Sequence, residues 1–164
     1  MDLKNKKILI IGMARSGLAA AKKKKNKGSY IIMNDLKTKE KLKDLVSEND
    51  FIDEFVLGKH FTDLEIIDLV VISPGVPLNI KPVKKANKFG IEVIGELELA
   101  YRLVEGKFIG ITGTNGKTTT TALTSEIYKN SNDNTFCVGN IGKPAVSISD
   151  KKKKKSNIIT EVSS

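Results

Sequence analysis

The chain has 164 residues, 40% of them apolar, and a formal net charge of +9. This length suits one ordinary domain, or one small domain and part of another, and the apolar content excludes a disordered chain. The single cysteine, Cys137, excludes an internal disulfide framework and fits a reducing compartment.

The N-terminus is basic, but the apolar run before Gly12 is shorter than the roughly 7–15 residues of a signal peptide. No apolar run approaches the about 20 residues that a membrane helix needs. We therefore expect a soluble, cytoplasmic protein that does not contact membranes.

The positive charge is concentrated in two lysine tracts, at 22–27 and 151–155. Without the ten lysines of these tracts, the charge falls from +9 to −1. Only Arg15 and Arg102 are arginines, and tryptophan is absent, whereas nucleic-acid readers use arginine and aromatic residues. We expect no nucleic-acid partner, and a lysine-rich nucleic-acid binder remains the weakest alternative.

The first part of the chain alternates between strand and helix signals. Short apolar runs that end in glycine, an acid or a Pro-Gly turn predict strands. They lie at 6–12, 29–35, 69–75 and 91–95, and helical segments are expected at 16–28, 38–48 and 80–90. This alternation predicts a Rossmann-like α/β domain with a parallel sheet over residues 1–95. Lys22 and Lys25 fall on the face of the first helix that should be buried, so we expect its second half to pack poorly.

A helix at 96–107 is expected to link this domain to a second α/β unit. Strands are expected at 108–113, 135–142 and 156–162, with a helix at 117–130. We interpret 108–164 as the beginning of a second, truncated α/β domain.

The stretch GITGTNGKTTTT (110–121) has the character of a phosphate-binding loop between a strand and a helix. Its glycines allow backbone N–H groups to face phosphate oxygens, and the helix N-terminus adds partial positive charge. Lys117 is expected to reach the β- and γ-phosphates, and the Thr118 hydroxyl to bind Mg²⁺. The usual loop has a glycine where this chain has Ile111. A second metal ligand is expected from Glu161, for which a surface acid is an equal alternative.

The stretch GMARSG (12–17), followed by Asp35, is similar to the dinucleotide-binding fingerprint. Ala14 replaces its middle glycine, which weakens the case for NAD and leaves a plain strand–helix turn as a competitor. A nucleotide-sized crevice at the carboxyl ends of the strands remains, with Asp35 and the SPG turn (73–75) on the same edge.

Together these motifs resemble the Mur ligases of peptidoglycan synthesis. TGTNGKTTT (112–120) resembles the family's ATP loop, and GNIG (139–142) and EVSS (161–164) resemble its next two motifs. GMARSGLA (12–19), SPGVP (73–77) and GELEL (95–99) are similar to the members that add D-glutamate. Members that add L-alanine usually have histidine where Asn115 stands.

The resemblance implies an ATP- and Mg²⁺-dependent ligase that joins D-glutamate to UDP-N-acetylmuramoyl-L-alanine through an acyl phosphate. It implies that ATP is held by Gly113, Thr114, Asn115, Gly116, Lys117, Thr118 and Thr119, with Lys117 also catalytic, and Mg²⁺ by Thr118 and Glu161. It implies that the UDP-sugar is held by Ala14, Arg15, Ser16, Gly17, Asp35, Ser73, Pro74, Gly75 and Asn140. Leu36 and Lys37 stand where the family often has a small polar pair.

The family's sequence continues beyond EVSS, so we expect this chain to be an N-terminal fragment without ligase activity, and the full-length protein to be a monomer. Another ligase of the superfamily, adding L-alanine or of the folylpolyglutamate type, is one alternative. A non-catalytic nucleotide-binding module, such as an NAD-binding redox sensor, is another. His60, the only histidine, is expected to be a surface loop residue.

Overall fold

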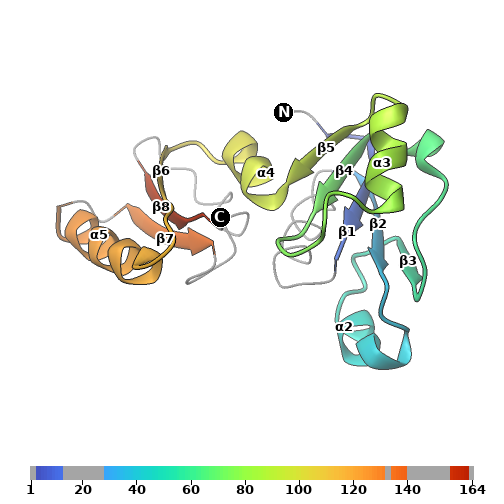
Figure 1. Cartoon of the computed structure of the whole chain (residues 1–164), viewed down its shortest axis with the longest axis horizontal. Coiled ribbons are helices and arrows are strands. Elements are labelled where there is room, and N and C mark those ends of the chain that lie inside the picture. The colour runs from blue at the N-terminus through green and yellow to red at the C-terminus, as the bar shows by residue number, and fades with distance from the viewer. Residues whose placement is uncertain (1–2, 13–27, 132–133, 140–155, 163–164) are drawn as a thin grey trace. The chain divides into compact units, whose positions relative to one another are not determined.

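The computed structural model describes residues 3–12, 28–131, 134–139 and 156–162 (Figure 1). The chain forms two compact units, Met1–Glu96 and Leu97–Ser164. The predicted helix at 16–28, including Lys22 and Lys25, lies largely outside the described residues. Within the described part of the chain, no helix is both long and apolar enough to cross a membrane.

The first unit is built on a five-stranded parallel sheet in the order β3-β2-β1-β4-β5 (Figure 1). The strands are β1 (Lys7–Ile11), β2 (Tyr30–Asp35), β3 (Glu54–Leu57), β4 (Leu69–Ile72) and β5 (Glu92–Gly95). This order confirms the predicted Rossmann-like α/β class. It also places a topological switch point between β1 and β4, where α/β proteins commonly bind ligands.

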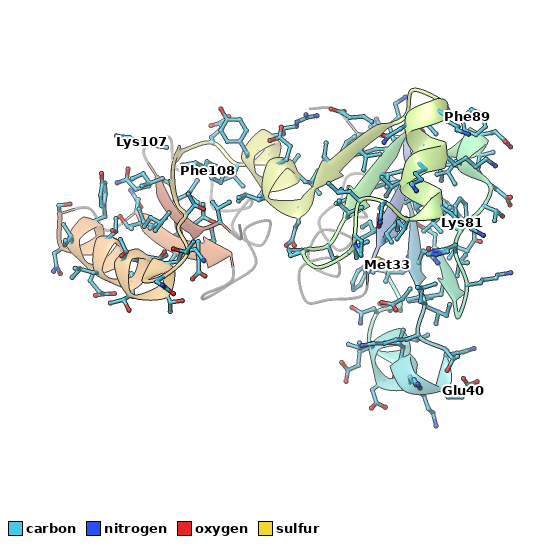
Figure 2. The ribbon with its side chains drawn as sticks, viewed as in Figure 1. Met33, Glu40, Lys81, Phe89, Lys107 and Phe108 are labelled. Carbon is cyan, nitrogen blue, oxygen red and sulfur yellow. The ribbon has the colours of Figure 1, made fainter. Side chains whose placement is uncertain are left out.

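The core of the first unit is formed by strands that are almost entirely apolar and bury side chains on both faces of the parallel sheet. In β1, four successive residues from Ile8 to Ile11 are at most 5% exposed. The helix α3 (Lys81–Lys88) covers part of one face, with Val83 and Ala86 packed against Leu9, Ile32 and Val70. Figure 2 shows Lys81 and Phe89 at the two ends of this helix.

The predicted helix at 38–48 is only partly present. Residues Glu40–Leu42 form the 3₁₀ turn η1, and only Lys43–Ser47 form the α-helix α2. Glu40 lies on this peripheral turn (Figure 2), and Leu42 is its one buried residue. With so little surface to bury, the segment lacks the packing that usually stabilises a longer helix.

Strand β3 was not predicted, although it pairs with β2 from Ile32↔Glu54 to Asp35↔Leu57. It has four residues, none of them fully buried, so it lacks the strong apolar run that marks the other strands. A second 3₁₀ turn, η2 (Leu64–Ile66), precedes β4.

The second unit contains a three-stranded parallel sheet in the order β6-β8-β7. Its strands are β6 (Lys107–Ile111), β7 (Thr135–Gly139) and β8 (Asn157–Glu161), and the helix α5 spans Lys117–Ser131. These elements confirm the three predicted strands and the helix after the first of them.

The predicted helix at 96–107 is shorter than expected, because α4 spans only Glu96–Leu103. A Cβ at Gly106 would lie 2.8 Å from the carbonyl oxygen of Ser156, and the N–H of Lys107 donates to that same oxygen. The chain must therefore be extended and close to β8 by residue 106, which ends the helix before it.

Candidate functional site

The first unit has a cavity of about 160 Å³ at the carboxyl ends of β1 and β2, open to solvent. Its lining residues come from two strand ends and two loops: Ile11, Gly12, Asn34, Asp35, Leu36, His60, Gly75, Val76, Pro77 and Ile80. Most of this wall is apolar, with three polar side chains from Asn34, Asp35 and His60. The volume is below the roughly 300–1,000 Å³ of sites that enclose a whole small molecule, so it suits one part of a ligand.

Two motifs that the sequence placed 61 residues apart meet at this cavity. The Ser73 hydroxyl donates to the carbonyl of Gly12 at 2.9 Å, and the Ser73 N–H donates to the carbonyl of Ile11. Gly12 has φ +98°, and a Cβ there would lie 3.0 Å from the Cβ of Ser73. Glycine is therefore required by both the backbone conformation and the close approach of the two loops.

Among the predicted UDP-sugar residues, Asp35 and Gly75 line the cavity, whereas Pro74 is exposed beside it. Ser73 is buried, and its hydroxyl donates its proton to the carbonyl of Gly12. Its side chain therefore joins the loop after β4 to the end of β1. The remaining predicted contacts, Ala14, Arg15, Ser16, Gly17 and Asn140, lie outside the described residues.

Asp35 ends β2 with its carboxylate oriented by the local backbone. Its Oδ1 accepts from the N–H of Lys37 at 2.9 Å, which is an Asx turn. The next residue, Leu36, is 59% exposed and lines the cavity. Leu36 and Lys37 thus contribute an apolar side chain and a backbone N–H to this edge.

Sequence reasoning missed Asn34, which is 1% exposed. Its side-chain amide donates to the carbonyls of Val56 and Lys59, both at 2.7 Å, and accepts from the N–H of Phe61 at 3.2 Å. One side chain therefore fixes the loop that follows β3. Only the tertiary fold reveals this, because the partners lie 22 to 27 residues away.

The expectation that His60 is a surface loop residue is confirmed only in part, because it lies on a loop but is not fully exposed. His60 is half-buried and lines the cavity, and its Nδ1 is buried with no hydrogen-bond partner among the described residues. The sequence signal was weak, since a single histidine between Lys59 and Phe61 has no recognisable motif.

The second candidate site is the loop between β6 and α5. Gly113 and Gly116 have φ of +150° and +74°, and α5 begins at Lys117. Thr114, Asn115 and Thr119 are exposed on this loop and on the first turn of the helix. The strand, the loop and the helix N-terminus are thus arranged as an anion site requires. The Lys117 ammonium folds back to donate to the carbonyl of Gly113.

Thr118 and Glu161 meet at the ends of α5 and β8. The Thr118 hydroxyl donates to Oε2 of Glu161 at 3.2 Å. Glu161 is only 9% exposed and ends the central strand of its sheet, paired with Ile111 and Gly139. It is therefore not the surface acid that the sequence left as an alternative.

These two oxygen ligands fit Mg²⁺, which prefers hydroxyl, carboxylate, phosphate and water oxygens. Magnesium usually takes only one or two protein ligands at nucleotide sites. Accordingly, the described residues contain no group of three or more His, Cys, Asp or Glu side chains that could hold a metal alone.

Comparison with known proteins matches both units to one family. A family model described as "Mur ligase MurD-like, N-terminal domain" matches residues 6–95, and "Mur ligase middle domain" matches residues 111–164. The UDP-N-acetylmuramoylalanine–D-glutamate ligase of Alkaliphilus metalliredigens is 48% identical, and that of Clostridioides difficile 44% identical, each over the whole chain. The chain spans 37% of the length of each of these relatives.

Among solved structures, UDP-N-acetylmuramate–alanine ligase MurC from Thermotoga maritima is similar to this chain. The match covers 95% of this chain and 36% of the MurC chain. The TM-score is 0.51 at 20% sequence identity, a level that supports a shared fold.

Proposed function

The chain belongs to the Mur ligase family, and from that premise we propose that it provides the uridine-nucleotide and ATP sites of a ligase. The proposed ligase joins D-glutamate to UDP-N-acetylmuramoyl-L-alanine with ATP. The observation that carries the proposal is a cavity lined by the carboxyl ends of β1 and β2 and by the loops after β3 and β4, together with the glycine-containing loop before α5.

In the first unit, we assign the cavity to the uridine diphosphate part of the substrate. Its apolar wall suits the face of a base, and Asp35 supplies an acceptor for a base or ribose donor. By the resemblance of their motifs, we also assign Gly75, residues 14–17 and Asn140 to the UDP-sugar site.

In the second unit, we assign residues Gly113–Thr119 to ATP. The backbone N–H groups at the start of α5 would face the phosphates, and Lys117 would exchange its bond to Gly113 for the β- and γ-phosphate oxygens. A charged amine among phosphates forms stronger hydrogen bonds than it forms with a carbonyl. Lys117 is therefore the proposed catalytic residue of this chain.

In the proposed reaction, the alanyl carboxylate attacks the γ-phosphorus and ADP leaves. The amine of D-glutamate then displaces phosphate from the acyl phosphate. Mg²⁺, held by Thr118 and Glu161, would neutralise charge on the phosphates. The protein contributes mainly by positioning the reactants and by electrostatic stabilisation.

The ligase activity is proposed for the whole protein, and we expect no ligation by the 164-residue chain alone. D-glutamate-dependent phosphate release by this chain would contradict that expectation. We propose a cytoplasmic, monomeric protein without nucleic-acid partners, and the free thiol of Cys137 fits a reducing compartment.

The proposal is tested by the ligand dependence of thermal unfolding. The chain is heated with UDP-N-acetylmuramoyl-L-alanine, UDP, NAD or Mg-ATP, because binding to the folded state raises the midpoint. We expect the uridine nucleotides and Mg-ATP to raise it and NAD to leave it unchanged. A response to NAD alone would overturn the assignment of the first unit.

Two variants assign the responses to sites. Asp35→Asn is expected to reduce the response to UDP only, and Lys117→Met the response to Mg-ATP only. Asp44→Asn, at an exposed acid on α2, is the matched control for Asp35→Asn. Equal responses to UDP in the Asp35 and Asp44 variants would remove Asp35 from the proposed site.

A further inference from the structure

The loop after β3 brings His60 to the cavity on a fixed backbone. Asn34 holds the carbonyl of Lys59 and the N–H of Phe61, which are the two neighbours of His60. Gly58, with φ +73°, donates its N–H to the carbonyls of Asp35 and Lys37. The loop is therefore tied to the end of β2, where Asp35 also lines the cavity.

The imidazole of His60 has two different nitrogens in this environment. Nδ1 is buried and has no hydrogen-bond partner within the described part of the chain. A proton on Nδ1 would make it a buried donor without an acceptor, which is unfavourable. The neutral tautomer with its proton on Nε2 leaves Nδ1 as an unpaired acceptor, which folded proteins tolerate more often than an unpaired donor, and makes Nε2 a hydrogen-bond donor. Nε2 is thus the nitrogen that can meet a ligand.

We propose that His60 recognises the pyrimidine base in this cavity by donating its Nε2 proton to a base carbonyl. This inference rests on the proposed function of the first unit. It adds a specificity-determining residue that none of the sequence motifs contains. The apolar side chains of Val76, Pro77 and Ile80 provide the surface against which a planar base can lie.

The polar groups of the cavity complement uracil better than cytosine. Uracil presents an N–H donor between two carbonyl acceptors. A carboxylate such as that of Asp35 can accept several hydrogen bonds, and His60 supplies a donor from the adjacent loop. Cytosine has an acceptor at the ring nitrogen and an amino donor next to it. Its ring nitrogen would therefore face the acceptor of Asp35, and its amino group the donor of His60.

The test is calorimetric titration of the 164-residue chain with UDP and CDP. His60→Ala is expected to weaken UDP binding about tenfold, the usual effect of losing one hydrogen bond to a ligand. Loss of a contact to the 4-carbonyl should change CDP binding less, because cytosine has an amino group at that position, whereas loss of a contact to the 2-carbonyl should weaken both nucleotides alike. His60→Gln places an amide nitrogen near the position of Nε2 and should restore UDP binding, whereas His60→Asn reaches only the position of Nδ1 and should not.

Thio-substituted nucleotides identify the carbonyl that His60 contacts. In 2-thio-UDP and 4-thio-UDP, a weakly accepting sulfur replaces one oxygen. One of the two should bind the unmodified chain more weakly than UDP and should be insensitive to His60→Ala. Such non-additivity indicates a direct contact. Additive effects for both analogues would overturn the inference.

Lys59→Ala is the matched control, because Lys59 is the exposed neighbour of His60 and its backbone carbonyl is retained. It should bind UDP like the unmodified chain. If the unmodified chain binds UDP and His60→Ala binds it equally well, the role of His60 is refuted while the proposed function stands. If the unmodified chain binds no uridine nucleotide, both are refuted. Rescue by His60→Asn instead of His60→Gln would also refute the donor role of Nε2.

Discussion

The hydroxyl of Thr118 donates a 3.2 Å hydrogen bond to the carboxylate of Glu161, across 43 residues of sequence. The bond joins the first turn of α5 to the end of β8 and places two hard oxygen ligands side by side. This arrangement supports a magnesium site beside the phosphate loop.

Removing the hydroxyl should weaken magnesium-dependent nucleotide binding. We expect Thr118→Ala to lower the affinity for ATP about tenfold with Mg²⁺ present and to have little effect with EDTA, because the metal loses a ligand. Thr118→Ser should retain binding, and Glu161→Gln should behave like Thr118→Ala. The measurement is calorimetric titration at several Mg²⁺ concentrations.

Thr120→Ala, at an exposed threonine of the same helix, is the control. Equal Mg²⁺ dependence in Thr118→Ala and Thr120→Ala would exclude the site.

Lys117 provides a separate prediction for the phosphates. Lys117→Met should lower ATP affinity by at least about tenfold, because a charged donor near phosphate is worth more than a neutral one. Lys129→Met makes the same charge change at the other end of α5, where Lys129 pairs with Glu126, and should leave ATP affinity unchanged. Similar losses in both variants would indicate general charge attraction and not a specific contact.

Gly12 should be intolerant of a side chain. Its φ of +98° is strained for other residues, and an added Cβ would lie 3.0 Å from both Ser73 Cβ and Val76 Cγ2. Strain and overpacking together predict that Gly12→Ala lowers the free energy of unfolding by about 2–4 kcal/mol. Gly90 has a φ of +67°, but an added Cβ there would meet open space. Gly90→Ala should therefore lower the free energy of unfolding by only about 1–2 kcal/mol. Urea unfolding of both variants measures the difference, and equal losses would refute the steric argument.

Asp68 should make stability depend on pH. The hydrogen bond from the Lys6 ammonium, and then that from the Lys7 N–H, hold the pKa of Asp68 below its ordinary value. A lowered folded-state pKa stabilises the protein above the unfolded pKa of about 3.9, and this contribution is lost as the pH falls through the folded-state pKa. Because the side chain is 36% exposed, we expect Asp68→Asn to cost only about 0.5–1 kcal/mol at pH 7.

The free energy of unfolding of the unmodified chain and the Asn variant should converge as the solution becomes acidic. Asp50→Asn makes the same charge change at an exposed acid of the same unit and is the matched control. A gap between Asp68→Asn and the unmodified chain that persists well below pH 3.9 would contradict the prediction.

The regular part of the fold was predictable because local signals agreed with each other. Apolar runs such as Ile8–Ile11 are buried where they form the central strands of the parallel sheet, and glycines end them where the chain must turn. Where local signals were weak, prediction failed: β3 has four residues and little burial, and the segment at 38–48 has one buried apolar residue in its 3₁₀ turn.

The sequence by itself determined the strand–loop–helix arrangement around Gly113–Thr118 and the order of strands and helices, because these depend on residues that are close in the chain. Only the tertiary structure decided that Glu161 lies against Thr118, and that Asn34 and His60 belong to the cavity at the end of β2. These relationships join residues separated by 22 to 43 positions. No local pattern encodes them, because they arise only when parallel strands bring their carboxyl ends to one edge of a sheet.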